Sequence, residues 1–249
     1  MKYKKRMNAL SVFGLLCCFA FVVSACGNSE TDTTPKADTA SNIETESNME
    51  TENRIVEQNE AEYTYLRSST VEDVISDPCF EDFGRLLFPV DRSVSENMTL
   101  EEISSGSIYA WYNYIDPDKT VEIIQSLHDH AAAGEQIFYK IYSEEEKEAD
   151  PSKEDTGLFF FRGNPGEKFA VVNAGGGFMH VGAMQDSFPH ALELSKMGYN
   201  SFALMYRPDD PYTDLARAIS FIYDHAEELG VIPEDYSLWG GSAGARMTV

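Results

Sequence analysis

The second half of the chain alternates apolar runs with amphipathic stretches, and this alternation constrains the fold more than any other feature. Residues 168–173 and 201–206 are almost continuously apolar, as strands covered on both faces require. After the second run, apolar residues recur every three or four positions: Leu215, Ile219, Ile222, Ala226 and Leu229. Alternating strands and helices predict right-handed crossovers and a mostly parallel sheet with helices on both faces, which is an α/β fold.

Other signals extend this pattern over residues 136–249. The apolar stretches 137–142 and 157–161 precede the first buried strand, and we expect them to pair as an antiparallel start of the sheet. A helix is expected to begin at Ser187, with Gly198 after its last turn. Residues 236–239 predict a short strand that runs straight into a glycine pair.

Residues 63–135 carry helix signals instead of strand signals. Two capping-box pairs and one Asp-Pro helix start with a terminating glycine occur there: Thr70 with Asp73, Thr99 with Glu102, and Asp116-Pro117 with Gly134. We expect a helical N-terminal extension on or over the α/β part, either as plain packing or as a cap that covers a substrate.

The N-terminus has the features of an export signal. Basic residues within 2–6 precede an apolar run over residues 9–25, which ends in the sequence VSACG at 23–27. Small residues before a cysteine resemble the bacterial lipoprotein lipobox, which implies that Cys26 is lipidated and becomes the mature N-terminus. An ordinary cleaved signal or an uncleaved membrane helix is the alternative. We expect residues 1–25 to be a signal peptide and the protein to be lipid-anchored on the extracytoplasmic side of a bacterial membrane.

Residues 26–62 form an acidic segment with few large apolar side chains. Such a composition buries too little surface to offset the entropy of ordering, so a disordered tether is expected. The acidic runs 44–60 and 144–150 are expected to be solvated tether and loop. A formal net charge of −23 argues against nucleic acid as a partner, because two anions repel each other.

The cysteines and histidines give no metal-site pattern. Of four cysteines, only Cys26 and Cys79 remain after removal of the signal, so a lipidated Cys26 leaves no intrachain disulfide. Cys79 has no basic neighbour and is expected to be a small buried residue rather than a nucleophile. His128 and His130 lie two apart on a predicted helix and face different sides. We expect neither a metal nor a cofactor.

The sequence GGSAG at residues 240–244 carries the strongest chemical signal, the Gly-x-Ser-x-Gly pattern of a nucleophile elbow. The bare pattern arises by chance in roughly one chain in ten of this length. Here a predicted strand ends directly before it and a small-residue helix start follows. Side chains in place of the glycines would collide with the neighbouring strand and helix. Ser242 is therefore the candidate nucleophile.

A second motif, NAGGGF at residues 173–178, follows the first buried strand. Consecutive glycines let the main chain approach a substrate carbonyl closely. The amides of Gly176 and Gly177, with that of Ala243 behind the serine, are the predicted oxyanion hole. A phosphate-binding loop is the alternative, but neither Gly-x-Gly-x-x-Gly nor a Walker lysine is present.

Together these motifs resemble the α/β-hydrolase superfamily, and most closely its esterase and lipase group with a His-Gly-Gly-Gly-Phe motif and a Gly-x-Ser-Ala-Gly elbow. The resemblance covers residues 136–249 and departs at Ala174, where that group has histidine. It implies a serine hydrolase, a carboxylesterase or acetylesterase that cleaves small acyl esters through Ser242, with acetylated carbohydrate as the expected substrate. A serine peptidase or acyltransferase of the same fold stays open. So does an inactive hydrolase-like surface protein that binds without catalysis.

The resemblance also implies an acid and then a histidine after the nucleophile. Residues 243–249 contain neither. We therefore expect an incomplete α/β-hydrolase fold that is truncated before both groups and inactive as it stands. Among the upstream histidines, His180 beside the glycine motif is the one spatially plausible base, since His190 and His225 lie on predicted helices.

The lipobox gives a first prediction. Cys26→Ala should release the protein from membranes or block its maturation, because the lipidated thiol is lost. Incorporation of radiolabelled palmitate measures this, with Cys79→Ala as the control that keeps the label. Equal labelling of the Cys26→Ala variant would refute the assignment.

Overall fold

The computed structural model describes residues 64–89, 94–105 and 116–249, which belong to one compact unit, Glu60–Val249. The expected signal peptide, Cys26 and the acidic tether lie outside the described residues. Within the part that is described, no helix is both long enough and apolar enough to span a membrane.

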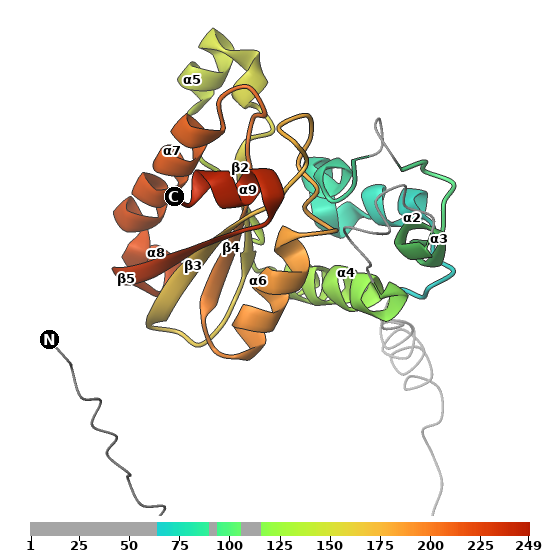
Figure 1. Cartoon of the computed structure of the whole chain (residues 1–249). Helices are drawn as coiled ribbons and strands as arrows, with labels where there is room; N and C mark the ends of the chain where they lie inside the picture. Colours follow the sequence, from blue (N-terminus) through green and yellow to red (C-terminus); the bar gives the residue numbers. More distant parts are fainter. Residues whose placement is uncertain (1–63, 90–93, 106–115) are drawn as a thin grey trace, which may run out of the picture. The chain divides into compact units, whose positions relative to one another are not determined.

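A five-stranded sheet with the order β1-β2-β4-β3-β5 forms the centre of this unit (Figure 1). The strands are β1 (Phe138–Lys140), β2 (Gly157–Phe161), β3 (Glu167–Asn173), β4 (Asn200–Met205) and β5 (Val231–Gly240). β2 is antiparallel to both β1 and β4, whereas β4, β3 and β5 run parallel. The expected antiparallel start and α/β fold class are confirmed, and the arrangement is consistent with part of an α/β-hydrolase fold.

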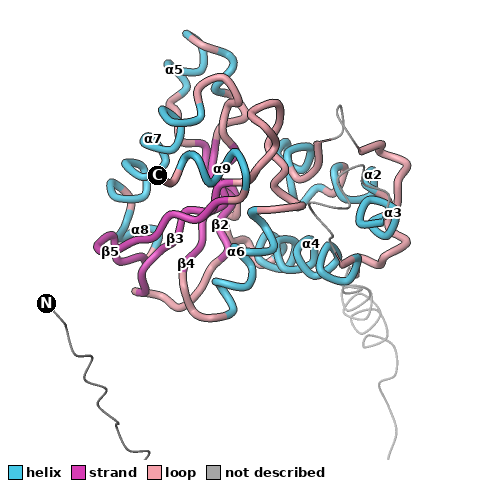
Figure 2. The backbone as a smooth tube through the Cα atoms, viewed as in Figure 1, coloured by secondary structure: helices cyan, strands magenta, loops and turns pink. Residues whose placement is uncertain are grey.

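Helices cover both faces of the sheet (Figure 2). One face packs against α2 (Val71–Ile75), the 3₁₀ helix η1 (Pro78–Leu86), α3 (Leu100–Ser105), α4 (Pro117–Ala132) and α6 (Ser187–Lys196). The other packs against α7 (Pro211–Asp224), α8 (Ala226–Leu229) and α9 (Ser242–Met247). Alternate side chains of β2 enter the two cores, since Phe159 contacts Phe188 of α6 and Phe160 stacks on Phe202 of β4.

The helix starts predicted before residue 135 are present. Thr70 and Asp73 form a reciprocal capping box, and so do Thr99 and Glu102. Helix α4 begins after Asp116, whose carboxylate accepts a hydrogen bond from the Asp118 amide. Beyond its end Gly134 has a φ of +80°, the left-handed conformation expected of a terminating glycine.

Two expectations about local structure were wrong. The acidic run 144–150 is not a loop, because Ser143 and Glu146 form a capping box that starts α5 (Glu144–Ala149), followed by the 3₁₀ turn η2 (Pro151–Lys153). The single amphipathic helix expected over 215–229 is broken between α7 and α8. At the break the His225 ring stacks on Phe221 and its Nδ1 lies 2.8 Å from the Phe221 carbonyl oxygen.

A buried ion pair ties the end of β4 to helix α7. Asp214 is fully buried, and its carboxylate accepts hydrogen bonds from the Arg207 guanidinium at 2.6 Å and from the Arg207 amide at 2.7 Å. The Tyr142 hydroxyl donates a third at 2.6 Å. Burial, with the hydrogen bond to Asp214 second, raises the pKa of Tyr142 to about 12, so the phenol stays a donor.

Removing one member of this pair tests its contribution. Asp214→Ala should lower the free energy of unfolding by about 3–5 kcal/mol, because the largely buried Arg207 loses its one fully buried carboxylate partner and the Tyr142 hydroxyl loses its acceptor. Asp209→Ala, in the exposed turn between the two, should change it by no more than about 0.5 kcal/mol. Urea unfolding followed by circular dichroism measures both, and equal stabilities would contradict the prediction.

Candidate active site

Ser242 lies in a sharp turn between strand β5 and helix α9. Its φ is +47°, a left-handed conformation that a residue with a side chain rarely adopts. The residue is exposed to solvent, while Ala243 and Gly244 behind it are buried. A strained, exposed serine between a strand and a helix is the geometry of a nucleophile elbow.

The glycines around Ser242 are required by close approaches of the main chain. A Cβ atom at position 240 would lie 2.5 Å from the Gly244 carbonyl carbon, and one at position 244 would lie 2.0 Å from the Asn173 carbonyl oxygen. The predicted collisions with the following helix and the neighbouring strand are both present. At position 241 the obstacle is instead a side chain, the Asp186 carboxylate, 2.3 Å from an added Cβ.

The glycine-rich loop after β3 lies against the elbow. A Cβ atom at position 175 would be 3.0 Å from Ser242 Cβ, so a side chain there would crowd the elbow. The next residues form a tight turn in which the Met179 amide donates to the Gly176 carbonyl oxygen at 3.0 Å. Gly177 and Phe178 in the centre of this turn both have positive φ.

Hydrogen bonds fix the start of this loop from three sides. The Asn173 side-chain amide donates to the Trp239 carbonyl oxygen at 3.0 Å, and the Gly241 amide donates to the Asn173 carbonyl oxygen at 3.3 Å. The buried Tyr206 hydroxyl donates to the Ala174 carbonyl oxygen at 2.7 Å. These hydrogen bonds therefore fix the glycine-rich loop relative to the elbow.

The predicted oxyanion donors have free amides. Among the described residues, none accepts a hydrogen bond from the Gly176 or Gly177 amide. Ala243 is in the first turn of α9, where amides have no intrahelical acceptor. The structure thus places Ser242 and the start of α9 next to the glycine motif.

Among the hydrogen bonds of the described histidines His130, His190 and His225, none joins the Ser242 hydroxyl. The carbonyl oxygen of His180 packs on Gly176, 2.0 Å from an added Cβ. His190 Nδ1 lies 2.7 Å from the Asp186 carbonyl oxygen, and His225 contacts its own helix.

Sequence reasoning missed Asp186 as a residue of this site. Its carboxylate is buried and accepts a hydrogen bond from the Gly175 amide at 2.6 Å. Burial raises the pKa of this carboxyl, although the Gly175 amide opposes the shift. The one signal in the sequence is an aspartate directly before Ser187, a position that normally caps a helix.

Asp77, Cys79 and His128 form a second polar cluster, with potential ligand atoms within 4.8 Å of one another. The Asp77 carboxylate already accepts hydrogen bonds from the Tyr65 hydroxyl at 2.5 Å and the Cys79 amide at 2.8 Å. Burial, with Asp77 second, raises the pKa of the Cys79 thiol and disfavours the thiolate needed for catalysis or metal binding. We assign the cluster to packing of the N-terminal helices on α4.

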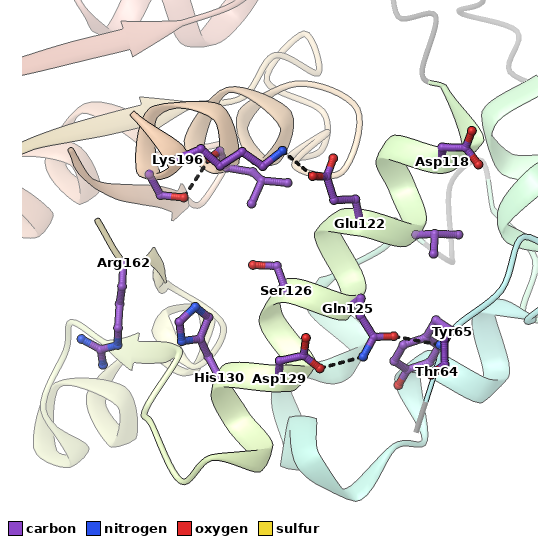
Figure 3. A pocket seen from close by; sticks show the side chains of 13 residues that line it. Thr64, Tyr65, Asp118, Glu122, Gln125, Ser126, Asp129, His130, Arg162 and Lys196 are labelled. Carbon is purple, nitrogen blue, oxygen red and sulfur yellow. Dashed lines mark hydrogen bonds and ion pairs between the residues drawn. The ribbon is translucent and has the colours of Figure 1, made fainter. Parts of the chain in front are cut away.

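A pocket of about 610 Å³ lies on α4 beside Lys196 of α6 and Arg162 (Figure 3). None of its lining residues belongs to the elbow or to the glycine-rich loop. Several of its polar groups already have partners: Figure 3 shows Lys196 directed at Glu122, and Gln125 donates to Asp129 at 2.7 Å. The chemistry of Ser242 is therefore not located in this pocket.

Comparisons with known proteins give similarity only at the level of solved structures. No family model matches the chain, and no curated protein matches it. An acetyl ester-xyloside bifunctional hydrolase from Caldicellulosiruptor lactoaceticus is similar at 23% identity and a TM-score of 0.40, over 45% of this chain and 44% of that one. An esterase from Thermogutta terrifontis is similar at 27% identity and a TM-score of 0.35, over 38% of each chain. Esterase B from Lactobacillus rhamnosis is similar at 19% identity and a TM-score of 0.36, over 52% of this chain and 47% of that one.

These matches span less than half of each of the three enzymes. Every TM-score lies below 0.5, so the functional argument rests on the sequence and the geometry of this chain.

The contact of Gly244 with β3 can be tested by adding one methyl group. Gly244→Ala should lower the free energy of unfolding by about 1–3 kcal/mol, because the added Cβ meets backbone that must move. Gly182→Ala is the matched control, since its Cβ would come no closer than 3.4 Å to any atom. Calorimetric unfolding compares the two, and equal transitions would show that α9 is not packed on β3 in this way.

Proposed function

We propose that the protein is a serine hydrolase that cleaves small carboxylic esters through an acyl-enzyme on Ser242. The observation that carries the proposal is the positive φ of Ser242 at the junction of β5 and α9, with the hydroxyl exposed beside a glycine-rich loop. A strained serine conformation is costly and is kept where the surrounding structure imposes it, which is typical of nucleophiles.

The chemistry proceeds in two halves. The Ser242 oxygen attacks the ester carbonyl carbon, and the negative charge on the carbonyl oxygen accepts hydrogen bonds from the Ala243 amide and from Gly176 or Gly177. Collapse of this intermediate expels the alcohol and leaves the acyl group on Ser242, and water then releases the acid. Oxyanion stabilisation of this type contributes about 10²–10³-fold per donor.

The serine hydroxyl needs a base, because at its ordinary pKa it is a poor nucleophile. The resemblance to α/β-hydrolases places an acid and a histidine after the serine, and residues 243–249 hold neither. The proposed reaction therefore requires an acid and a histidine in addition to the residues of this site. A histidine that accepts the Ser242 proton and returns it to the leaving alcohol completes the reaction.

We propose short acyl groups, and acetyl groups on carbohydrate in particular, as the substrate class. We further propose that the enzyme acts on the extracytoplasmic side of the membrane, tethered through lipidated Cys26. Both proposals rest on the sequence resemblances, to the esterase group and to the lipobox respectively.

The nucleophile is tested in the full-length protein. Ser242→Ala should lower kcat for p-nitrophenyl acetate by about 10⁴-fold or more, because no acyl-enzyme forms. The thermal transition should be almost unchanged, since the exposed hydroxyl makes no hydrogen bond to the described residues. Ser220→Ala, on the exposed face of α7, is the matched control and should keep full activity.

Acetate release from acetylated xylo-oligosaccharides measures the substrate class in the same preparations. Retained hydrolysis by Ser242→Ala would exclude the serine as nucleophile. A faster reaction with long-chain than with acetyl esters would exclude the proposed substrate class.

A further inference from the structure

Asp186 directs its side chain away from the helix that it precedes. An aspartate at the N-cap normally accepts a hydrogen bond from an amide in the first turn of its own helix. Asp186 is the N-cap residue of α6 and makes no such bond. Its Oδ2 accepts instead from the Gly175 amide, at 2.6 Å. The capping contact of one helix is given up for a contact with the glycine-rich loop.

The same carboxylate contacts both the elbow and the glycine-rich loop. Its Oδ2 lies 2.3 Å from a Cβ added at Gly241 and 3.0 Å from one added at Gly175. A Cβ added at Gly175 would also lie 3.0 Å from Ser242 Cβ. The carboxylate therefore fills the space between loop and elbow directly behind the nucleophile.

This buried position is energetically unfavourable for a carboxylate. Asp186 is 8% exposed, and within the described residues no lysine or arginine forms an ion pair with it. The one basic group near it is His190, whose Nδ1 is 4.0 Å from Oδ1 and whose side chain is 59% exposed. Burying an uncompensated carboxylate costs free energy, which the Gly175 hydrogen bond offsets only in part.

We propose that Asp186 is a positioning residue of the esterase site, which holds the glycine-rich loop at the distance from Ser242 where its amides stabilise the oxyanion. This inference rests on the proposed function. Fixing the Gly175 amide orients the peptide units that follow, those of Gly176 and Gly177. Asp186 acts through these amides and does not touch the substrate.

The role depends on a hydrogen-bond acceptor at this position rather than on negative charge. A negative charge close to a developing oxyanion opposes catalysis, whereas the bond to Gly175 supports it. Asparagine has a side chain of the same length, keeps an acceptor oxygen and removes the charge. Alanine removes the acceptor and leaves the Gly175 amide without a partner.

The test compares Asp186→Ala and Asp186→Asn in the full-length protein, with Asp210→Ala as the matched control. Asp210 also precedes a helix without a side-chain cap bond, but it pairs with Arg207 away from the elbow. In Asp186→Ala, kcat for p-nitrophenyl acetate should fall about 10- to 100-fold, because an oxyanion donor displaced by an ångström loses most of its effect. KM should change little, since ground-state binding does not use these amides. Asp186→Asn should restore most of kcat, and Asp210→Ala should keep it.

Hydrogen exchange of the peptide covering residues 174–182 supplies a readout that does not depend on turnover. It should be faster in Asp186→Ala and near normal in Asp186→Asn. An unchanged kcat in Asp186→Ala, or an equal loss in both Asp186 variants, would overturn the inference while the esterase function stood. If the unsubstituted protein hydrolyses no ester, the proposed function fails and the inference with it.

Discussion

The approach of helix α9 to the end of strand β3 is the contact on which the candidate site depends. It is possible only because position 244 has no side chain, since any Cβ there would meet the Asn173 carbonyl oxygen at 2.0 Å. This contact fixes the first turn of α9 beside the glycine-rich loop. It also forces the strand-to-helix turn to be sharp, and Ser242 therefore takes its positive φ. Strain at one residue is imposed by packing of its neighbours.

The parallel part of the sheet explains why these groups meet. Strands β4, β3 and β5 run in the same direction, so their carboxyl ends lie at one edge. β3 delivers the glycine-rich loop, β4 delivers Tyr206, and β5 delivers Ser242. The aromatic cores on the two faces keep the strands in register, because helices packed on both sides leave the sheet no freedom to shift.

Two buried aspartates show how the same residue type serves different ends. Asp214 is compensated by Arg207 and Tyr142, and it ties α7 to the sheet as a structural pair. Asp186 accepts a hydrogen bond from the Gly175 amide, and among the described residues its one ion-pair partner is the exposed His190, at 4.0 Å. Removing one partner of a buried ion pair leaves the other charge uncompensated, whereas a buried carboxylate that has no cationic partner is costly from the start.

The sequence by itself determined most of the sheet and its covering helices, and it singled out Ser242 as the candidate nucleophile. Continuous apolar runs predicted β3 and β4, the three-to-four-residue spacing of apolar side chains predicted α7, and the glycines at 240–244 predicted the elbow, because each of these signals is local. It did not predict helix α5, where a capping box outweighs a run of like charge, or the break at His225, where a ring contact competes with helix continuation. Only the tertiary structure decided the place of Asp186 at the candidate site. The carboxylate turns from its own helix to the Gly175 amide, and Gly241 is brought to it from a strand more than fifty residues later, so no pattern around residue 186 encodes either contact.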